Sequence, residues 1–504
     1  MKLYVGIGAL VLSIALFIWH NDKALWSIQY FCHQLFVSSP SSKPINALPP
    51  CRNCNLILIS LDTLRADRLG FFGAKNTATP ALDRIAAQST VFTAAFTNAY
   101  FTTPSHMSVF TSLYPPTHQV DGSVSSRVLD SQYTTLAEVL QKRGYNTLWS
   151  GPTGFKFLDP HLGFGRGFSS FYEPVFPRGS DVGQKQPAAA ITTLHAKMKS
   201  DTPTFLFLHS FMTHLPYFQN PNNYSTNSFD NTTIPYGTDL LRNFLPKLKM
   251  HPQLLMFQMN RPPQDPQQIH ALIQHCSQEH TLRTCFQRYA SADSFWHALG
   301  QWQLEKATEK FKPLTSTPHS QELAQYRDTY DRAVQQLDKT VEQIWTTLEK
   351  KNTLVVIFSD HGEELFEHGA GSHTNFFEHT ARVPVIIYHP KVQEGTRVPQ
   401  LFSLVDLMPT ILETLEIPSP PQTQGKAPWR HARSHVFGGT MRSVFVRTVE
   451  WKFLRSPNGD EQLFFLPEDP EEKNNLLPTD LPWVKAAHRR LDQDLRQWEL
   501  EQQL

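Results

Sequence analysis

Two long apolar runs dominate the hydrophobic pattern of the chain. Residues 55–62 and 353–360 are rich in leucine, isoleucine and valine, alternate little with polar residues, and each end on an aspartate. Such runs are typical of strands buried on both faces of a parallel sheet. Because open parallel sheets bind ligands at the carboxyl ends of their strands, Asp62 and Asp360 are candidate metal ligands. The alternative for Asp62 is an N-cap of the helix that follows.

A helical period precedes the second run. The pattern between residues 326 and 348 indicates an amphipathic helix with apolar positions at Val334, Leu337, Val341, Ile344 and Leu348. A helix that leads into a buried strand is the repeating unit of a parallel sheet. The pattern therefore predicts an α/β fold with a doubly wound, mostly parallel sheet.

The last part of the chain has a different pattern. Short strand-like runs at residues 435–437, 443–447, 452–454 and 462–466 precede a helical pattern from about Trp483. We therefore expect a small α+β C-terminal subdomain over residues 421–504, after a main domain over residues 51–420. Within the main domain, residues 218–320 read as a helical insertion, which either caps the ligand site or decorates the periphery.

The N-terminal segment predicts a membrane anchor. Residues 3–19 carry no charge and follow Lys2, and about 17–25 apolar residues span a bilayer. No small-x-small cleavage site follows, so residues 1–22 favour an uncleaved signal-anchor over a removed signal peptide. Residues 23–50 form a juxtamembrane segment and a Ser/Pro-rich linker. We expect a single-pass membrane protein with its catalytic domain on the extracytoplasmic side, periplasmic or extracellular.

Cysteine spacing fits that compartment. Cys51 and Cys54 form a CxxC pair, and Cys276 lies close to Cys285. Outside the cytoplasm this spacing predicts two local disulfides and leaves Cys32 over. A redox CxxC is the alternative, but it normally opens a helix rather than a strand, and a zinc ribbon needs a second CxxC. The net charge of +1 argues against nucleic acid as a partner.

A short helical segment adds a hydroxyl to the two strand ends. Thr102 stands two residues before Pro104, at the start of an apolar-periodic run. The free backbone N–H groups at a helix N-terminus attract phosphate or sulfate. An ordinary helix cap is the alternative for Thr102.

The second apolar run continues with His361 directly after Asp360. Carboxylate and imidazole side chains at one edge of a sheet form a ligand set for a divalent metal. With Asp62 and Thr102, these residues predict a four-ligand metal site that includes a hydroxyl.

The order of these segments resembles the sulfatase branch of the alkaline phosphatase superfamily. The resemblance rests on residues 55–67, on Thr102-Thr-Pro-Ser-His106 and on Ser359-Asp-His-Gly-Glu363. Further segments resemble the family in the same order, at residues 205–217, 404–410 and 463–476. The resemblance implies an alkaline phosphatase/sulfatase-like fold and an enzyme acting on phosphate or sulfate esters.

The chain departs from the family at several positions. Sulfatases carry a Cys or Ser, converted to formylglycine, where Thr102 stands, and an arginine where His106 stands. Calcium-dependent members commonly have Asp at the position of Thr63 and Asn at the position of His361. Because imidazole suits zinc or manganese better than calcium, we expect one divalent ion of the former kind. The threonine motif is closer to nucleotide pyrophosphatase/phosphodiesterases, and the ligand set resembles phosphoethanolamine transferases and lipoteichoic acid synthases.

The resemblance also implies roles around the metal. Thr102 is the expected nucleophile, and His214 and His373 either protonate the leaving group or hold a second, weaker metal. Ser105 occupies the place of an oxygen-binding Asn in the phosphodiesterases, and His106 completes the motif. Ser210 stands where the family has an acidic residue, which argues against a full two-metal site.

The sequence therefore predicts a metal-dependent hydrolase or transferase that acts on phosphate or sulfate esters through Thr102. Its substrate would be a small-molecule, lipid or glycan ester. One alternative is a sulfuric ester hydrolase that works without formylglycine. The other is a non-catalytic binding protein, against which the cost of burying unpaired charges argues. The pattern predicts neither the natural substrate nor the oligomeric state.

Overall fold

The computed structural model describes residues 26–27, 30, 45–75, 77–122, 126–151, 158–172, 202–214, 217, 317–369, 371–440 and 443–502. Its main element is an eight-stranded sheet with the order β10-β2-β9-β6-β1-β5-β3-β4. The strands of this sheet are β1 (Asn55–Leu61), β2 (Thr90–Phe96), β3 (Asn146–Ser150), β4 (Ser170–Tyr172), β5 (Thr204–Ser210), β6 (Thr353–Phe358), β9 (Val385–Tyr388) and β10 (Thr396–Ser403).

The sheet is mostly parallel, as the apolar runs predicted. Strand β1 lies at its centre and pairs in parallel with β5 and β6, so that Leu58 stands opposite Phe207 and Val356. Strand β9 runs antiparallel to both of its neighbours, β2 and β6. Because β1, β5 and β6 run parallel to one another, their carboxyl ends meet at one edge of the sheet.

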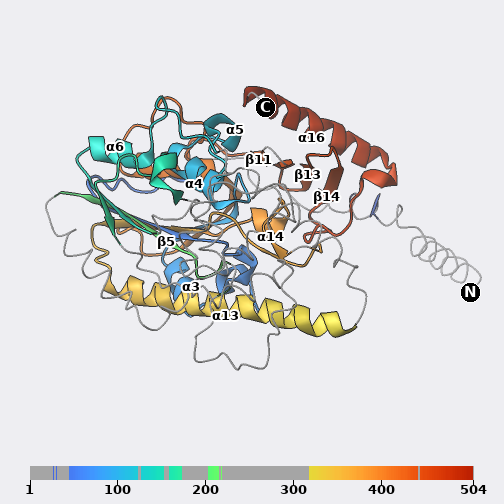
Figure 1. The fold of residues 1–504 in the computed structure, drawn as a ribbon, viewed down its shortest axis with the longest axis horizontal. Coiled ribbons are helices and arrows are strands. Elements are labelled where there is room, and N and C mark those ends of the chain that lie inside the picture. The colour runs from blue at the N-terminus through green and yellow to red at the C-terminus, as the bar shows by residue number, and fades with distance from the viewer. Residues whose placement is uncertain are drawn as a thin grey trace, which may run out of the picture.

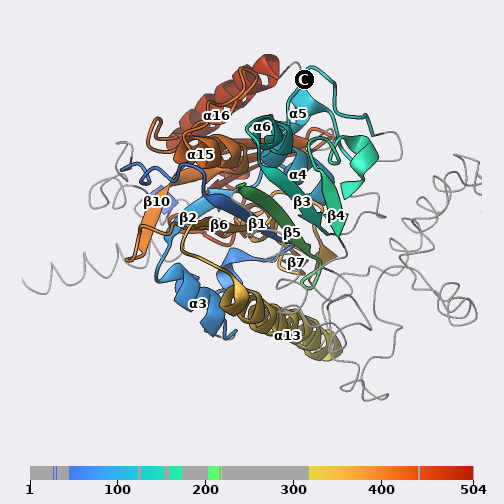
Figure 2. The same ribbon diagram turned by 90° about the vertical axis from the view of Figure 1, so that its left-hand side faces the viewer.

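Helices cover both faces of the sheet (Figure 2). One face packs against α4 (Thr102–Thr111), α6 (Leu136–Lys142) and α15 (Leu407–Thr414), and the other against α3 (Pro80–Ala86) and α13 (Thr317–Thr347). Alternate residues of β1 serve the two faces: Leu56 and Leu58 belong to the first core, and Ile57 and Ile59 to the second. This two-sided burial explains the continuous apolar runs.

Shorter elements connect these layers. They are the 3-10 helices η1 (Ala66–Arg68), η2 (Gly70–Phe72), η4 (Pro160–Leu162) and η7 (Leu404–Asp406), the helices α5 (Pro115–His118) and α14 (Glu378–Ala381), and the paired strands β7 (Glu364–Leu365) and β8 (Gly371–Ser372). Helix α13 contains the predicted helical period, and Tyr330, Val334, Leu337, Val341 and Ile344 are buried along it.

The expected C-terminal strands form a second sheet, antiparallel and four-stranded. It comprises β11 (Val436–Thr440), β12 (Ser443–Arg447), β13 (Trp451–Arg455) and β14 (Glu461–Phe465), followed by η8 (Leu477–Thr479) and α16 (Pro482–Glu501). Figure 1 shows α16 and these strands at one side of the main sheet. Asn98 joins the two parts, because its Nδ2 donates to Phe437 O at 2.6 Å.

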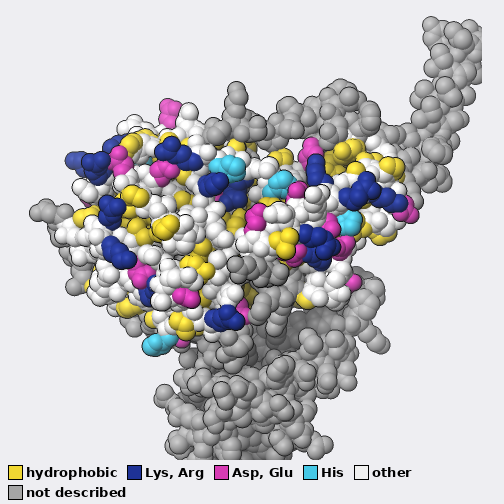
Figure 3. Space-filling model, turned by 90° about the horizontal axis from the view of Figure 1, so that it is seen from above, with side chains coloured by type: hydrophobic (Ala, Val, Ile, Leu, Met, Phe, Trp, Pro, Cys, Tyr) yellow, Lys and Arg dark blue, Asp and Glu magenta, His cyan; other side chains and the backbone are white. Residues whose placement is uncertain are grey.

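The face seen from above carries basic and acidic side chains interspersed with one another (Figure 3). Cys51 and Cys54 are joined by a disulfide, as the spacing predicted. The proposed anchor over residues 1–22, the second cysteine pair, Cys32 and nearly all of the 218–320 insertion lie outside the described residues. Among the described residues, no helix combines the length and the apolar character needed to cross a bilayer.

Candidate active site

Three elements bring the predicted metal ligands together. Asp62 follows β1, Asp360 and His361 follow β6, and Thr102 is the first residue of α4. Because β1 and β6 are parallel neighbours, their ends present these side chains at the same edge. The ligand atoms of Asp62, Asp360 and His361 all lie within 4.8 Å of one another, and all three residues are fully buried.

The Thr102 hydroxyl faces this cluster. Its Oγ1 lies 3.4 Å from Asp62 Oδ2 and 3.5 Å from His361 Nε2. The N-cap position of α4 belongs to Phe101, which provides no side-chain cap, and the Thr102 hydroxyl donates to Asp62 Oδ2. The alternative of an ordinary cap is therefore wrong for Thr102, whose hydroxyl points at the carboxylates instead of the free N–H groups of its own helix.

The cluster has unsatisfied carboxylate oxygens. Within the described part of the chain, Asp62 Oδ1 and Asp360 Oδ2 have no hydrogen-bond partner. Burial raises the pKa of both carboxyl groups, and the nearby Asp62 raises that of Asp360 further. Two buried carboxylates facing each other need a cation to remain ionised together. The residues present therefore fit a divalent metal ion.

Surrounding hydrogen bonds orient the ligands. His361 Nδ1 donates to Gly362 O at 2.9 Å, which leaves the Nε2 lone pair facing the cluster. Burial lowers the pKa of His361 to about 3, so the ring is neutral. Asp360 Oδ1 accepts the backbone N–H groups of Thr63, at 3.2 Å, and His361, at 2.9 Å. Oδ2 of Asp360 is thereby presented to the site.

Thr63 itself does not add a ligand. Its hydroxyl donates to Thr213 O at 2.6 Å, and its backbone has a φ of 55°, which is uncommon for a β-branched residue. Backbone strain of this kind is concentrated at functional sites. The strained turn brings the Thr63 N–H to Asp360.

His106 and Ser105, in the first turns of α4, lie next to the cluster on the side of Asp360. His106 Nδ1 is 2.8 Å from Thr102 O and its Nε2 is 2.7 Å from Ser60 Oγ, so the ring bridges α4 and β1. Burial lowers the pKa of His106 to about 3, which makes it neutral. Ser105 Oγ donates to Asp360 O at 2.7 Å. Both side chains hold the backbone of metal-site residues in place.

His214 and His373 lie beside His361. The ring centroid of His373 is 4.4 Å from that of His361 and 5.2 Å from that of His214. Among the described residues, neither His214 nor His373 belongs to a group of three potential metal ligands. Their position next to the cluster fits proton transfer at the leaving group.

Two further residues of the site, Glu363 and His209, were not among the predicted site residues. Glu363 Oε1 is 3.2 Å from His373 Nδ1, and burial raises the pKa of Glu363 to about 8. His209 Nε2 is 3.4 Å from Asp62 Oδ2. His209 pairs with Ser60 in the sheet register, so a polar residue at the end of an apolar strand was the available signal. For Glu363 the signal was a carboxylate two residues after a metal ligand.

Comparisons with known proteins identify the family of this chain. A family model described as Sulfatase matches residues 54–417. Arylsulfatase K of Rattus norvegicus is 25% identical over 475 residues, which cover 88% of this chain and 77% of the relative. N-acetylglucosamine-6-O-sulfatase of Bacteroides thetaiotaomicron is 24% identical over 498 residues, which cover 88% of this chain and 85% of the relative.

Solved structures share the fold. One, determined in complex with its substrate D-glucosamine-2-N,6-O-disulfate, has a TM-score of 0.62 and 19% identity, and the match covers 89% of this chain and 98% of that chain. The phosphonate monoester hydrolase of Agrobacterium radiobacter has a TM-score of 0.59 and 19% identity, with 88% and 96% covered.

The fold and the site define an α/β protein in which a buried carboxylate–imidazole cluster faces a hydroxyl at a helix N-terminus. Members of the matching family bind a divalent metal ion. The match to the family model spans the whole main sheet and includes Asp62, Thr102, Asp360 and His361. This chain belongs to the sulfatase family.

Proposed function

We propose that this protein is a metal-dependent hydrolase that cleaves sulfate esters, with the Thr102 hydroxyl as its nucleophile. The observation that carries the proposal is the position of that hydroxyl, 3.4 Å from Asp62 and 3.5 Å from His361 in a buried cluster. Family membership supports the choice of ester. Relatives named as an arylsulfatase and as a sulfatase of N-acetylglucosamine support a small-molecule or glycan substrate.

The residues of the cluster also suggest the metal. Asp62, Asp360 and His361 would hold it, and the mixed oxygen and nitrogen donors favour zinc or manganese over calcium. A divalent ion bound there lowers the pKa of a neighbouring hydroxyl and polarises the ester oxygens.

The reaction then follows from the positions of the side chains. Thr102 Oγ1 gives its proton to Asp62 Oδ2, 3.4 Å away, and attacks sulfur in line, so that an O–S bond forms while the S–O bond to the leaving alcohol breaks. Glu363, whose pKa burial raises to about 8, holds a proton near neutral pH and lies 3.2 Å from His373 Nδ1. The pair supplies that proton to the departing oxygen. Water attacks the sulfated threonine at sulfur, releases sulfate and restores the hydroxyl.

A second candidate is the cleavage or transfer of phosphate or phosphonate esters by the same steps. The observation that favours it is Thr102 itself, because a single hydroxyl cannot form the hydrated aldehyde of formylglycine. A covalent adduct on threonine must be released by attack at its sulfur or phosphorus. The structural likeness to a phosphonate monoester hydrolase supports this candidate.

Residues 1–22 extend the proposal to location. The uncharged run at residues 3–19 supports a membrane anchor that places the hydrolase on the extracytoplasmic side of the membrane, facing a glycan or lipid substrate. Fusing a reporter that is active on one side only to the C-terminus of the full chain tests this placement. Activity of a cytoplasmic reporter would contradict it.

The test of the activity is a substrate panel on the purified full chain with zinc, manganese or calcium. The panel contains nitrophenyl sulfate, glucosamine 6-sulfate, nitrophenyl phosphate, bis-nitrophenyl phosphate and a phenylphosphonate monoester. Metal-dependent release of sulfate that is lost in Thr102→Ala supports the proposal. Thr111→Ala is the matched control, because Thr111 lies in the same helix and its hydroxyl bonds to Met107 O.

The other outcomes separate the alternatives. Turnover of phosphorus esters alone would replace the first candidate with the second. Equal turnover by wild type and Thr102→Ala would show that threonine is not the nucleophile. Bound metal without turnover of any ester would point to a lipid or glycan transferase that these esters do not satisfy, and absence of both metal and turnover would favour the non-catalytic binding protein.

A further inference from the structure

A second group of potential ligands lies beside the active site. Glu364 of β7, His368 in the turn after it and His379 of α14 have ligand atoms within 4.8 Å of one another. None of the three belongs to the cluster of Asp62, Asp360 and His361. The group therefore needs an explanation of its own.

The donor atoms of this group are unsatisfied. Glu364 is fully buried, and within the described chain neither of its carboxylate oxygens has a hydrogen-bond partner. The same holds for Nδ1 of His368 and Nδ1 of His379. His368 Nδ1 approaches Glu364 Oε2 at 3.4 Å, which leaves the other oxygen and His379 unexplained. A buried carboxylate without a hydrogen bond, whose one histidine contact lies at 3.4 Å, is costly unless a cation compensates it.

The environment of His368 selects the ring nitrogen that faces the group. Its Nε2 donates to Glu471 O at 3.0 Å, so in the neutral ring Nδ1 keeps its lone pair. The ring also stacks on Phe377, with centroids 3.6 Å apart and planes 14° apart. Hydrogen bonds of this kind fix the tautomer and orientation of metal-binding histidines.

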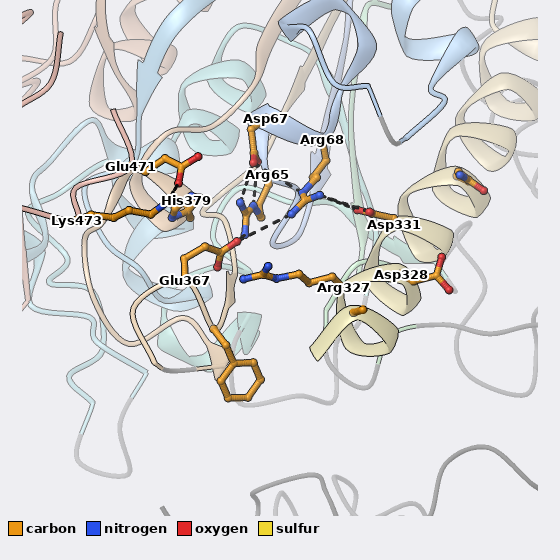
Figure 4. Close-up of a pocket in the computed structure, with 13 residues that line it drawn as sticks. Arg65, Asp67, Arg68, Arg327, Asp328, Asp331, Glu367, His379, Glu471 and Lys473 are labelled. Carbon is orange, nitrogen blue, oxygen red and sulfur yellow. Dashed lines mark hydrogen bonds and ion pairs between the residues drawn. The ribbon is translucent and has the colours of Figure 1, made fainter. Parts of the chain in front are cut away.

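The group has access to solvent. His379 lines a cavity of about 600 Å³ together with Arg65, Glu367 and Glu471, among others. Figure 4 shows His379 next to Glu471 at the side of this cavity, opposite the residues of α13. A cation can therefore reach the ligands without passing the Thr102 site.

We propose that Glu364, His368 and His379 form a second metal site, which binds zinc or a similar divalent transition metal. Two imidazoles and one carboxylate are a common set of three protein ligands for zinc, with a further position for water. Calcium is disfavoured because it prefers oxygen ligands.

The second site would brace the first. Glu363 and Glu364 are neighbours in the chain, yet Glu363 contacts His373 and Glu364 contacts His368. A metal bound to both Glu364 and His379 would hold Glu364 in place, and with it the neighbouring Glu363. The Gly362 N–H, which donates to Thr380 O at 2.8 Å, already joins the same two stretches of chain.

The first test is metal stoichiometry, which does not depend on turnover of any ester. The full chain is stripped with a chelator, titrated with zinc in a calorimeter and analysed for metal content. We expect two ions per wild-type chain, one in Asp360→Asn, one in His379→Ala and none in the double variant. One ion in the wild type that His379→Ala retains, or two ions in His379→Ala, overturns the proposal; one ion that only His379→Ala loses would count against the first site instead.

Cobalt absorption is the second measurement, because it reports on the ligands. The spectrum of the second ion should change in Glu364→Gln, which preserves side-chain shape, and not in His488→Ala. His488 is the matched control, since it is partly exposed, contacts Glu461 at 2.9 Å and the ring of Phe453, and belongs to neither cluster. If the metal-free variants melt at the same temperature as the metal-free wild type, their fold is intact. A cobalt spectrum that Glu364→Gln leaves unchanged shows that the group is an ion pair only.

Discussion

Thr102 differs from Thr111, another threonine of the same helix, in where its hydroxyl points. Thr111 bonds back to Met107 O at 2.6 Å, whereas Thr102 faces Asp62 and His361. Side-chain hydroxyls inside helices usually take the first arrangement. A hydroxyl directed away from its own helix and into a buried charge cluster is available for chemistry.

Substitutions at Thr102 should separate its hydroxyl from its methyl group. Thr102→Ser keeps the nucleophile, so we expect kcat/KM within about tenfold of wild type, whereas Thr102→Ala should lose about a thousandfold or more. The measurement is steady-state hydrolysis of whichever ester the wild type turns over. Equal activity of the two variants would exclude Thr102 as the attacking group.

Metal binding should depend on pH through Asp62 and Asp360. Burial raises the pKa of both carboxyls above the ordinary value of about 4, so the metal-free folded state holds protons that the unfolded chain has lost. Stability of the metal-free protein therefore falls as pH rises above about 4, and metal affinity rises because binding expels those protons.

Calorimetry in two buffers with different ionisation enthalpies measures the protons released at pH 6 and at pH 8. We expect greater release at pH 6 and tighter binding at pH 8. Asp360→Asn should lose the first site and its share of the released protons. Heats that do not depend on the buffer would contradict the linkage.

At the scale of elements, the site depends on how the turns after β1 and β6 are joined. Arg65, from the first turn, donates to Glu363 O at 3.0 Å and to Glu367 Oε1 at 2.8 Å in the second. The guanidinium is buried and also pairs with Asp67 at 2.7 Å. This network keeps the two turns that carry the candidate ligands Asp62, Asp360 and His361 in contact.

Glu367→Gln should destabilise the protein in a pH-dependent way. Burial raises the pKa of Glu367, but Arg65 and His379 outweigh that effect and lower the pKa to about 2, from an ordinary 4.5. The pair therefore contributes about 3 kcal/mol above pH 4.5, and this contribution is lost as pH falls toward 2. Urea unfolding at pH 7 and pH 3 measures the difference.

The control for Glu367 is the surface pair of Arg84 and Glu342, at 2.6 Å, whose side chains are 59% and 37% exposed. Solvent screens such a pair, so Glu342→Gln should change stability by less than about 1 kcal/mol at either pH. A pH-independent effect of Glu367→Gln would show that its charge is unimportant.

Gly362 allows two stretches of the chain between β6 and β9, around residues 362 and 379, to pack closely. A Cβ at this position would lie 1.9 Å from His379 O, a backbone atom. We expect Gly362→Ala to cost at least about 1–3 kcal/mol and to weaken metal binding, because the backbone must move. Gly459→Ala, in an open turn with a φ of 85°, should cost about 1 kcal/mol and leave metal binding unchanged. Denaturant unfolding and zinc titration of both variants test this.

The sequence predicted those parts of the fold and site that depend on local pattern. Asp62 and Asp360 were found because each ends an apolar run, and α13 because its period is long. The contact of His209 with Asp62 depends on the register between β1 and β5, and the contact of Glu363 with His373 depends on how the chain folds back ten residues later. No local pattern of the sequence reveals either. The sequence assigned no direction to β9, since a short buried strand looks alike in both directions.

At the scale of the whole molecule, the C-terminal sheet packs against the main sheet as part of one structure. Trp498 of α16 stacks on Phe437, with centroids 5.5 Å apart, and meets the edge of Tyr114 at 5.3 Å. Gly439 N donates to Asn98 O at 3.1 Å. These contacts couple the two sheets.

Trp498→Ala should therefore destabilise the entire chain, by about 3–5 kcal/mol. Unfolding followed by circular dichroism and by fluorescence should show one shared transition in the wild type and in the variant. Leu500→Ala, at a residue that is 72% exposed in the same helix, should have little effect. A separate early transition of the variant would show that the C-terminal sheet unfolds independently.

The antiparallel pairing of β6 and β9 has one more consequence. Residues 359–384 leave the sheet after Phe358 and return at Val385, and these two residues are partners across the base. Because the ends already meet, changes in length inside this excursion need not disturb the strands. The ligands of both clusters except Asp62 and Thr102 lie within it. The excursion is thus one continuous segment. Grafting it into another chain with the same strand pair would transfer five of the candidate metal ligands together, namely Asp360, His361, Glu364, His368 and His379.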